Sequence, residues 1–118
     1  MNWQFDNNLP IYTQIVDKYR LAIASGELKP GEKLAAVRDV AFQAGVNPNT
    51  MQRAFQELER LGLVYTQRSS GRYVTEEPDI ISDTRKKLAE EFVRRFLASM
   101  SGLGLDREQI IEFIMQNA

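Results

Sequence analysis

The chain has 118 residues, of which 43% are apolar, so it is long enough to bury one ordinary hydrophobic core. The absence of cysteine and histidine excludes disulfides, thiolate zinc sites, histidine metal sites and the catalytic triads built on these residues. No signal-peptide pattern opens the sequence and no apolar run approaches membrane-spanning length, so we expect a cytoplasmic protein that is not an enzyme, makes no membrane contact and needs no cofactor.

The formal net charge is only −1, but the charges are unevenly distributed along the chain. Residues 1–75 carry nine Lys or Arg against seven Asp or Glu, whereas residues 76–118 carry six against nine. This distribution is consistent with two regions, the first of which meets an anionic partner.

A first helix is predicted from Pro10 to Ser25, because the fixed φ of proline suits a first helical turn. Apolar residues recur along it at helical spacing, at Ile11, Ile15, Tyr19 and Ile23. Gly26 is expected to end the helix in the left-handed conformation, and residues 28–31 form a turn. Trp3 and Phe5 are expected to pack on this domain.

Two short helices come next, and their spacing predicts a helix-turn-helix. Apolar residues indicate the first from Ala35 to Ala44. Asn47 and Pro48 then place an N-cap side chain directly before a proline at the first helical position, and Gly62 ends the second helix. Only three residues separate the two helices, so they must cross steeply.

A β-hairpin is predicted after the second helix. Residues 63–67 (Leu-Val-Tyr-Thr-Gln) have the β-branched and aromatic composition of a strand, residues 68–71 form a turn, and residues 72–75 return. This order predicts a mainly α fold, an α+β winged helix-turn-helix domain over residues 1–77 with a short linker at residues 76–78.

Residues 78–118 are predicted to be a two-helix dimerisation region. An amphipathic helix is expected from about Ser82 to Ser101, and Asp106 caps a last helix with Gln109 three residues on, as in a capping box. Two helices this rich in apolar residues cannot hide both faces, so a second copy is expected to cover them. The expected interface residues are Leu88, Phe92, Phe96, Met100, Ile110, Ile111 and Ile114.

The second helix of the helix-turn-helix carries the side chains best suited to reading DNA. Such a helix enters the major groove with its N-terminal residues toward the base edges, where Asn and Gln pair with adenine and Arg with guanine or phosphate. The candidates are Asn47, Pro48, Asn49, Thr50, Gln52 and Arg53 on this helix, Arg38 on the preceding one, and Arg68, Ser70, Gly71 and Arg72 in the hairpin turn. A simple N-cap, a surface ion pair and an ordinary turn would explain the same residues without DNA.

Several segments in order resemble the GntR family of bacterial transcription regulators. They are residues 9–15 (Leu-Pro-Ile-Tyr-Thr-Gln-Ile), 23–34 (Ile-Ala-Ser-Gly-Glu-Leu-Lys-Pro-Gly-Glu-Lys-Leu), 37–41, 45–50, 54–59 and 62–64. The Val-Asn-Pro-Asn-Thr string at 46–50 and the short C-terminal part are similar to the YtrA subfamily. The resemblance implies operator contacts by Arg38, by residues 47–50 and by the hairpin turn around Gly71, and a homodimer formed by the C-terminal helices.

Two segments depart from the family pattern. Ala35 and Ala36 stand where the family has Pro-Ser, and residues 67–74 replace its Arg-Gly-Arg-Gly-Thr-Phe-Val hairpin. The sequence is therefore consistent with two alternative functions. The first is a repressor that binds an inverted-repeat operator as a homodimer, and the second is a winged-helix protein-interaction module without specific DNA binding. A small-molecule effector bound between the C-terminal helices would change the half-site spacing, although no residue identifies its chemistry.

Overall fold

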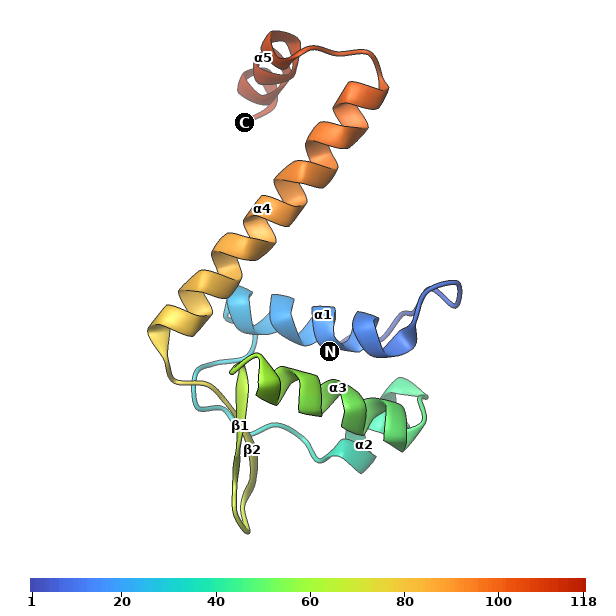
Figure 1. The fold of residues 1–118 in the computed structure, drawn as a ribbon, viewed down its shortest axis with the longest axis vertical. Coiled ribbons are helices and arrows are strands. Elements are labelled where there is room, and N and C mark those ends of the chain that lie inside the picture. Colours follow the sequence, from blue (N-terminus) through green and yellow to red (C-terminus); the bar gives the residue numbers. More distant parts are fainter. The chain divides into compact units, whose positions relative to one another are not determined.

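The computed structural model describes all residues, 1–118, and contains five helices and one hairpin (Figure 1). In chain order these are α1 (Ile11–Ser25), α2 (Val37–Ala44), α3 (Pro48–Arg60), β1 (Val64–Gln67), β2 (Gly71–Val74), α4 (Pro78–Gly102) and α5 (Arg107–Asn117). The predicted mainly α, winged-helix architecture is confirmed. The chain divides into two compact units, Met1–Arg85 and Lys86–Ala118.

Helix α1 begins and ends as the sequence predicts. Pro10 is its N-cap, and Gly26 closes it at φ 84° with its N–H bonded to the Ile23 carbonyl. Gln14 ties the preceding segment to the helix, because its side-chain amide accepts from the Asp6 N–H at 2.9 Å and donates to the Asp6 carbonyl at 2.8 Å. This arrangement allows Trp3 and Phe5 to pack against the core, as predicted.

The helix-turn-helix is formed by α2, a tight turn and α3. Gly45 takes the left-handed conformation at φ 69°, and the Asn47 side chain accepts from the Asn49 N–H at 2.8 Å, directly before Pro48. Helix α2 begins two residues later than predicted because Ala36 is extended, with φ −62° and ψ 149°. The preceding Leu34 is also extended, since its N–H donates to the Arg72 carbonyl of the hairpin.

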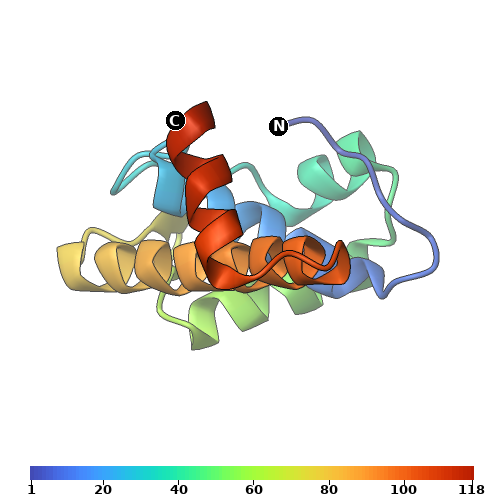
Figure 2. The same ribbon diagram turned by 90° about the horizontal axis from the view of Figure 1, so that it is seen from above.

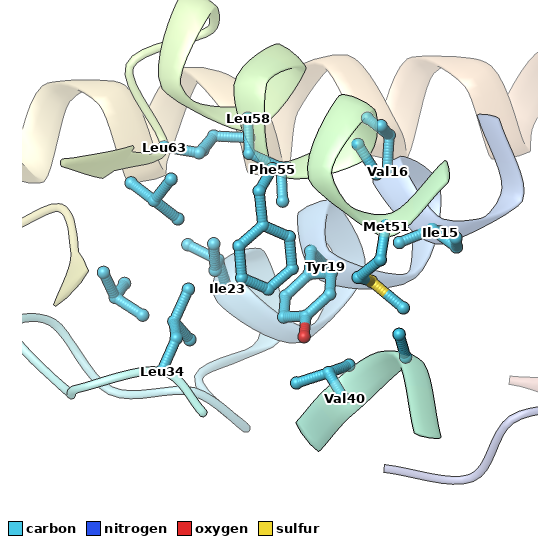
Figure 3. Close-up of a cluster of buried hydrophobic side chains, with 14 residues drawn as sticks. Ile15, Val16, Tyr19, Ile23, Leu34, Val40, Met51, Phe55, Leu58 and Leu63 are labelled. Carbon is cyan, nitrogen blue, oxygen red and sulfur yellow. The ribbon is translucent and has the colours of Figure 1, made fainter. Parts of the chain in front are cut away.

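The core lies among α1, α2 and α3 and along the base of the hairpin (Figure 3). Helix α3 contributes its apolar residues at i, i+3, i+4 and i+7 spacing, and each is 0% exposed: Met51, Ala54, Phe55 and Leu58. The Phe55 ring meets the Tyr19 ring of α1 edge to face, with 5.3 Å between centroids. Full burial of an aromatic ring of this size stabilises the fold by roughly 1.5–3 kcal/mol.

Strands β1 and β2 pair antiparallel, with Val64 opposite Val74 and Gln67 opposite Gly71. Both valines are buried and hold the base of the hairpin on the core. A third extended segment lies along β2, because the Leu34 N–H donates to the Arg72 carbonyl and the Val74 N–H donates to the Glu32 carbonyl, each at 2.9 Å. The hairpin is therefore anchored on one side to the chain that leads into α2.

Helix α4 begins at Pro78, four residues earlier than predicted. Proline is favoured in a first helical turn because its missing N–H has no partner there, and Asp79 adds a favourable charge at the positive end of the helix. The predicted linker at residues 76–78 therefore includes Pro78, which is the first residue of α4. None of the helices combines the length and apolar character that a membrane span requires.

The second unit consists of the rest of α4, a turn and α5. The predicted capping box is present, because Asp106 accepts from the Gln109 N–H and Gln109 accepts from the Asp106 N–H, both at 2.9 Å. Figure 2 shows α5 lying across the direction of α4 rather than continuing it. Many large apolar side chains of this unit remain exposed, with exposed fractions from 40% at Phe96 to 74% at Leu103.

Removal of the Asn47 cap tests how this side chain holds the recognition helix. Asn47→Ala is expected to lower the free energy of unfolding by about 1 kcal/mol, because the Asn49 N–H loses its acceptor. Urea unfolding followed by the fluorescence of Trp3, the only tryptophan, measures this loss. Asn49→Ala is the matched control, since it removes an exposed amide that accepts no capping bond, and an equal loss in both variants would contradict the cap.

Candidate nucleic-acid interface

An open groove of about 470 Å³ brings together much of the predicted DNA-binding set. Its walls come from the segment before α2, from α2 and α3, and from the hairpin. The predicted residues that line it are Arg38, Gln52, Ser70, Gly71 and Arg72. Lys33 adds a further positive charge. A concave, basic surface beside the second helix of a helix-turn-helix suits a phosphate backbone.

The start of α3 lies outside the lining of this groove. Asn47, Pro48 and Asn49 are exposed and Thr50 is half-buried, so the first turn of α3 is open to a partner. The Asn47 side-chain oxygen is occupied by the helix cap, which leaves its amide N–H groups free to donate. The positive end of the helix dipole lies at this turn, where the Asn49 N–H is taken by the Asn47 cap and Pro48 has no N–H to donate.

Two of the arginines that were predicted to contact DNA do not line the groove. Arg53 is exposed but lies over the Tyr12 ring of α1, 4.0 Å from the guanidinium carbon to the ring centroid. This cation–π contact holds its guanidinium against α1. Arg68 is exposed at the hairpin tip and does not line the groove. The sequence places Arg53 next to Gln52, but the helical turn sends the two side chains in different directions.

Arg72 is held by an ion pair that connects the hairpin to α3. Its Nε donates to Oε1 of Glu59 at 2.6 Å, and the Thr66 hydroxyl donates to the same oxygen at 2.7 Å. Its guanidinium also lies over the Phe55 ring, 5.4 Å from the centroid. These hydrogen bonds, from Arg72 above all, hold the pKa of the Glu59 carboxyl below its usual range.

The shape of the hairpin tip depends on the positive φ of Ser69 and on the close approach of the Lys33 side chain to Gly71. Ser69 is the only non-glycine residue with a positive φ, 68°, which turns the chain between β1 and β2. Ser70 and Tyr73 share a hydrogen bond between their hydroxyl groups. A Cβ on Gly71 would lie 3.1 Å from the Lys33 side chain, so glycine lets Lys33 pass close to the hairpin.

Sequence reasoning missed Lys33, Tyr12 and Glu59. The available signal for Lys33 was its position, as a basic residue between a Pro-Gly turn and the apolar Leu34, which is buried. Nothing in the local sequence indicates the Glu59 pair, because its partner lies 13 residues away across the hairpin.

A helix-turn-helix, a hairpin wing and a basic groove between them define a winged-helix DNA-binding protein. Residues 11–74 match the family described as bacterial regulatory proteins, gntR family. The chain belongs to the GntR family of transcriptional regulators, whose members act through a DNA-binding helix-turn-helix rather than as enzymes.

Relatives and solved structures agree with this assignment and with the YtrA-like subfamily. The chain is 42% identical to the HTH-type transcriptional regulator YhcF of Bacillus subtilis over 97% of this chain and 94% of that protein. It is 31% identical to the HTH-type transcriptional repressor YtrA of the same organism, over 93% and 85% respectively. A GntR family regulator from Listeria monocytogenes has a similar structure, with a TM-score of 0.86, 38% identity, and coverage of 95% of this chain and 98% of that one.

A more distant structure contains DNA. The DNA-binding domain of AraR in complex with operator ORX1 is 25% identical to this chain, with a TM-score of 0.58, and the similarity covers 64% of this chain and 96% of that one. The similar region is therefore nearly the whole of that DNA-binding domain.

The Glu59–Arg72 pair gives a pH-dependent prediction. Glu59→Gln is expected to lower the free energy of unfolding at neutral pH by about 1 kcal/mol, a modest value because the pair is partly exposed. The pKa of Glu59 is lower in the folded chain than in the unfolded chain. Its contribution is therefore complete above the unfolded value of about 4.3 and is lost as the pH falls through the folded value.

Urea unfolding at neutral pH and near pH 3 measures the difference in the free energy of unfolding between the wild type and Glu59→Gln. This difference should shrink in acid. Glu57→Gln is the control on the same helix, because Glu57 pairs with Arg60, whose side chain is 72% exposed. Equal losses in the two variants would mean that the contact with the wing adds nothing to the stability.

Proposed function

We propose that this protein is a repressor that binds a specific operator as a homodimer, with residues 1–77 contacting DNA and residues 78–118 joining the two copies. The observation that carries the proposal is the basic groove, which places Lys33, Arg38 and Arg72 beside Gln52 of α3. The relative YtrA is named a repressor, and the similar domain of AraR binds an operator. Since its target would be bacterial chromosomal DNA, we place the protein in the cytoplasm.

The side chains divide by the contacts that they would make. Asn49 and Gln52 present amide groups that would pair with the donor and acceptor pattern of adenine in the major groove, whereas Asn47 has its amide N–H groups to donate. Lys33 and Arg38 are point charges beside the helix and would contact phosphates, as would Arg68 at the exposed wing tip. Arg72 keeps its terminal N–H groups for DNA while Glu59 holds its Nε.

The second unit offers an apolar surface that a second copy would cover. A groove of about 450 Å³ lies between α4 and α5, and its walls are almost entirely apolar: Phe96, Met100, Phe113, Ile114, Asn117 and Ala118. Monomeric proteins rarely expose an apolar patch of this kind. Of the predicted interface residues, Phe92, Phe96, Ile111 and Ile114 are exposed and Met100 is half-buried. Leu88 and Ile110 are already buried in the single chain, so their role would be to support this surface.

A two-fold symmetric dimer would read two inverted half-sites separated by whole helical turns of DNA, ~34 Å per turn. Occupation of a promoter by such a dimer would block transcription. A small-molecule effector would control this occupancy by favouring one arrangement of the two copies.

Removal of Arg38 tests the groove. Arg38→Ala is expected to weaken operator binding by roughly ten-fold or more and to reduce its salt dependence, because a hydrogen bond to a charged phosphate is worth roughly 1.5–3 kcal/mol. Fluorescence anisotropy with the promoter region upstream of its own gene measures the affinity, at about 50 mM and about 200 mM salt and with unrelated DNA as competitor. Arg60→Ala is the control, since Arg60 pairs with Glu57 at the far end of α3 and does not line the groove.

Unchanged affinity in Arg38→Ala would remove this residue from the interface. Wild-type binding that competitor and salt both abolish would favour a protein-interaction module over an operator-specific repressor. Tight binding that survives the competitor would support the proposal, and footprinting would then locate the half-sites.

Introduction of a charge into the apolar groove tests the dimer. Ile114→Asp is expected to shift the protein to a monomer, because a carboxylate cannot be buried there without a partner. Sedimentation velocity over a range of concentrations measures the mass. Gln116→Asp, on the same helix but outside the groove, should leave the dimer intact, and a wild type that is monomeric at every concentration would refute dimerisation.

A further inference from the structure

A second cavity lies within the first unit, Met1–Arg85. It has a volume of about 290 Å³ and is bounded by the N-terminal segment, α1, the segment before α2, and α2 itself. Trp3, Tyr19, Val40 and Gln43 are among the residues that line it. This volume is just below the ~300 Å³ at which the range for drug-sized ligands begins, so the cavity suits a smaller molecule.

The Tyr19 hydroxyl is the polar group inside this cavity. Tyr19 is only 3% exposed, and its ring is fixed by Phe55 on one side and by Trp3, with centroids 5.9 Å apart, on the other. No group of the chain hydrogen-bonds to its hydroxyl, yet no fully enclosed side-chain polar atom lacks a partner. The hydroxyl must therefore open onto the cavity, and in Figure 3 it points toward the α2 ribbon that carries Val40.

Three residues of the lining carry a charge: Met1, through its amino terminus, Glu32 and Lys33. Burial raises the pKa of Tyr19, so its hydroxyl is a neutral donor at physiological pH. The side chains of Glu32 and Lys33 also contact other parts of the chain. Glu32 accepts from the Lys29 N–H at 2.9 Å, and the Lys33 side chain lies against Gly71 of the hairpin. The other groups of the lining include the Tyr19 hydroxyl, the Gln43 amide, the Trp3 indole and aliphatic side chains.

We propose that this cavity binds a small, flat, uncharged molecule, whose ring lies between Trp3 and Val40 and whose acceptor atom takes the Tyr19 hydroxyl proton in a hydrogen bond. Such a ligand satisfies the one unpaired polar group and brings no charge to be desolvated.

The cavity shares a wall with the DNA-facing groove. Lys33, Leu34 and Ala35 line both, and the Leu34 N–H is bonded to the Arg72 carbonyl of the wing. A ligand that displaces this segment would change how α2 and the wing are held relative to each other, and hence the affinity for DNA. This coupling rests on the proposed operator binding, and it is reciprocal, since DNA must change the affinity for the ligand by the same factor.

Benzamide is the probe for the site, because it is flat and neutral and carries a carbonyl acceptor. Trp3 is the only tryptophan and lines the cavity, so selective excitation of tryptophan fluorescence in the full-length protein reports occupancy directly. A saturable change is expected in the wild type. Tyr19→Phe keeps the ring contacts but removes the donor, and should weaken binding by roughly five- to ten-fold. Tyr12→Phe, on the same helix but outside the cavity, should bind as the wild type does.

Benzoate tests the charge preference, because it has the same shape with a carboxylate in place of the amide. It should bind benzamide's site at least ten-fold more weakly, and equal or tighter binding would overturn the uncharged-ligand class. No saturable change with benzamide, or equal affinity in Tyr19→Phe, would overturn the site itself.

The coupling is measured separately, by operator anisotropy with and without saturating benzamide. A shift in operator affinity that Tyr19→Phe abolishes at the same benzamide concentration supports the linkage. Unchanged operator affinity with Trp3 saturated overturns the linkage. A protein that binds no operator refutes the proposed function, while the Trp3 titration still decides whether the cavity is a ligand site.

Discussion

The burial of one face of α3 determines which side chains the helix presents to the groove beside the wing. Met51, Phe55 and Leu58 are completely enclosed, so α3 cannot rotate about its axis without exposing them. Each residue between them has a fixed direction as a result. Gln52 faces the groove, whereas Arg53, one position further, is turned onto α1. The core thus selects which side chains of the helix can reach a partner.

A second constraint acts on the wing, which is tied both to the segment before α2 and to α3. The Leu34 N–H is bonded to the Arg72 carbonyl, and the Arg72 guanidinium is bonded to Glu59 of α3. Two strands of four residues would be marginal alone, so these ties and the buried valines at the base keep the wing in place. The departures of this chain from the family's wing pattern leave that anchoring intact.

The local parts of this fold could be predicted from the sequence, and the long-range parts could not. The Asn47 cap, the Asp106 capping box and the left-handed Gly26 each depend on residues within one turn of chain, and the structure confirms all three. The early start of α4 was missed because Pro78 was interpreted as the end of a linker. Lys33 and the Glu59–Arg72 pair were missed because their positions depend on how the hairpin folds back on the chain.

The contact between Glu59 and Arg72 also constrains how this sequence can evolve. The Glu59 carboxylate offsets the positive charge of Arg72, so a change at either position alters both the attachment of the wing to α3 and the surface potential of the groove. Substitutions at positions 59 and 72 should therefore be correlated, so that an apolar or polar pair replaces both members of the ionic pair together. A lineage that lost only the acid would have a more basic wing that is less firmly attached to α3. Such a wing would attract any phosphate backbone more strongly but would position it less precisely.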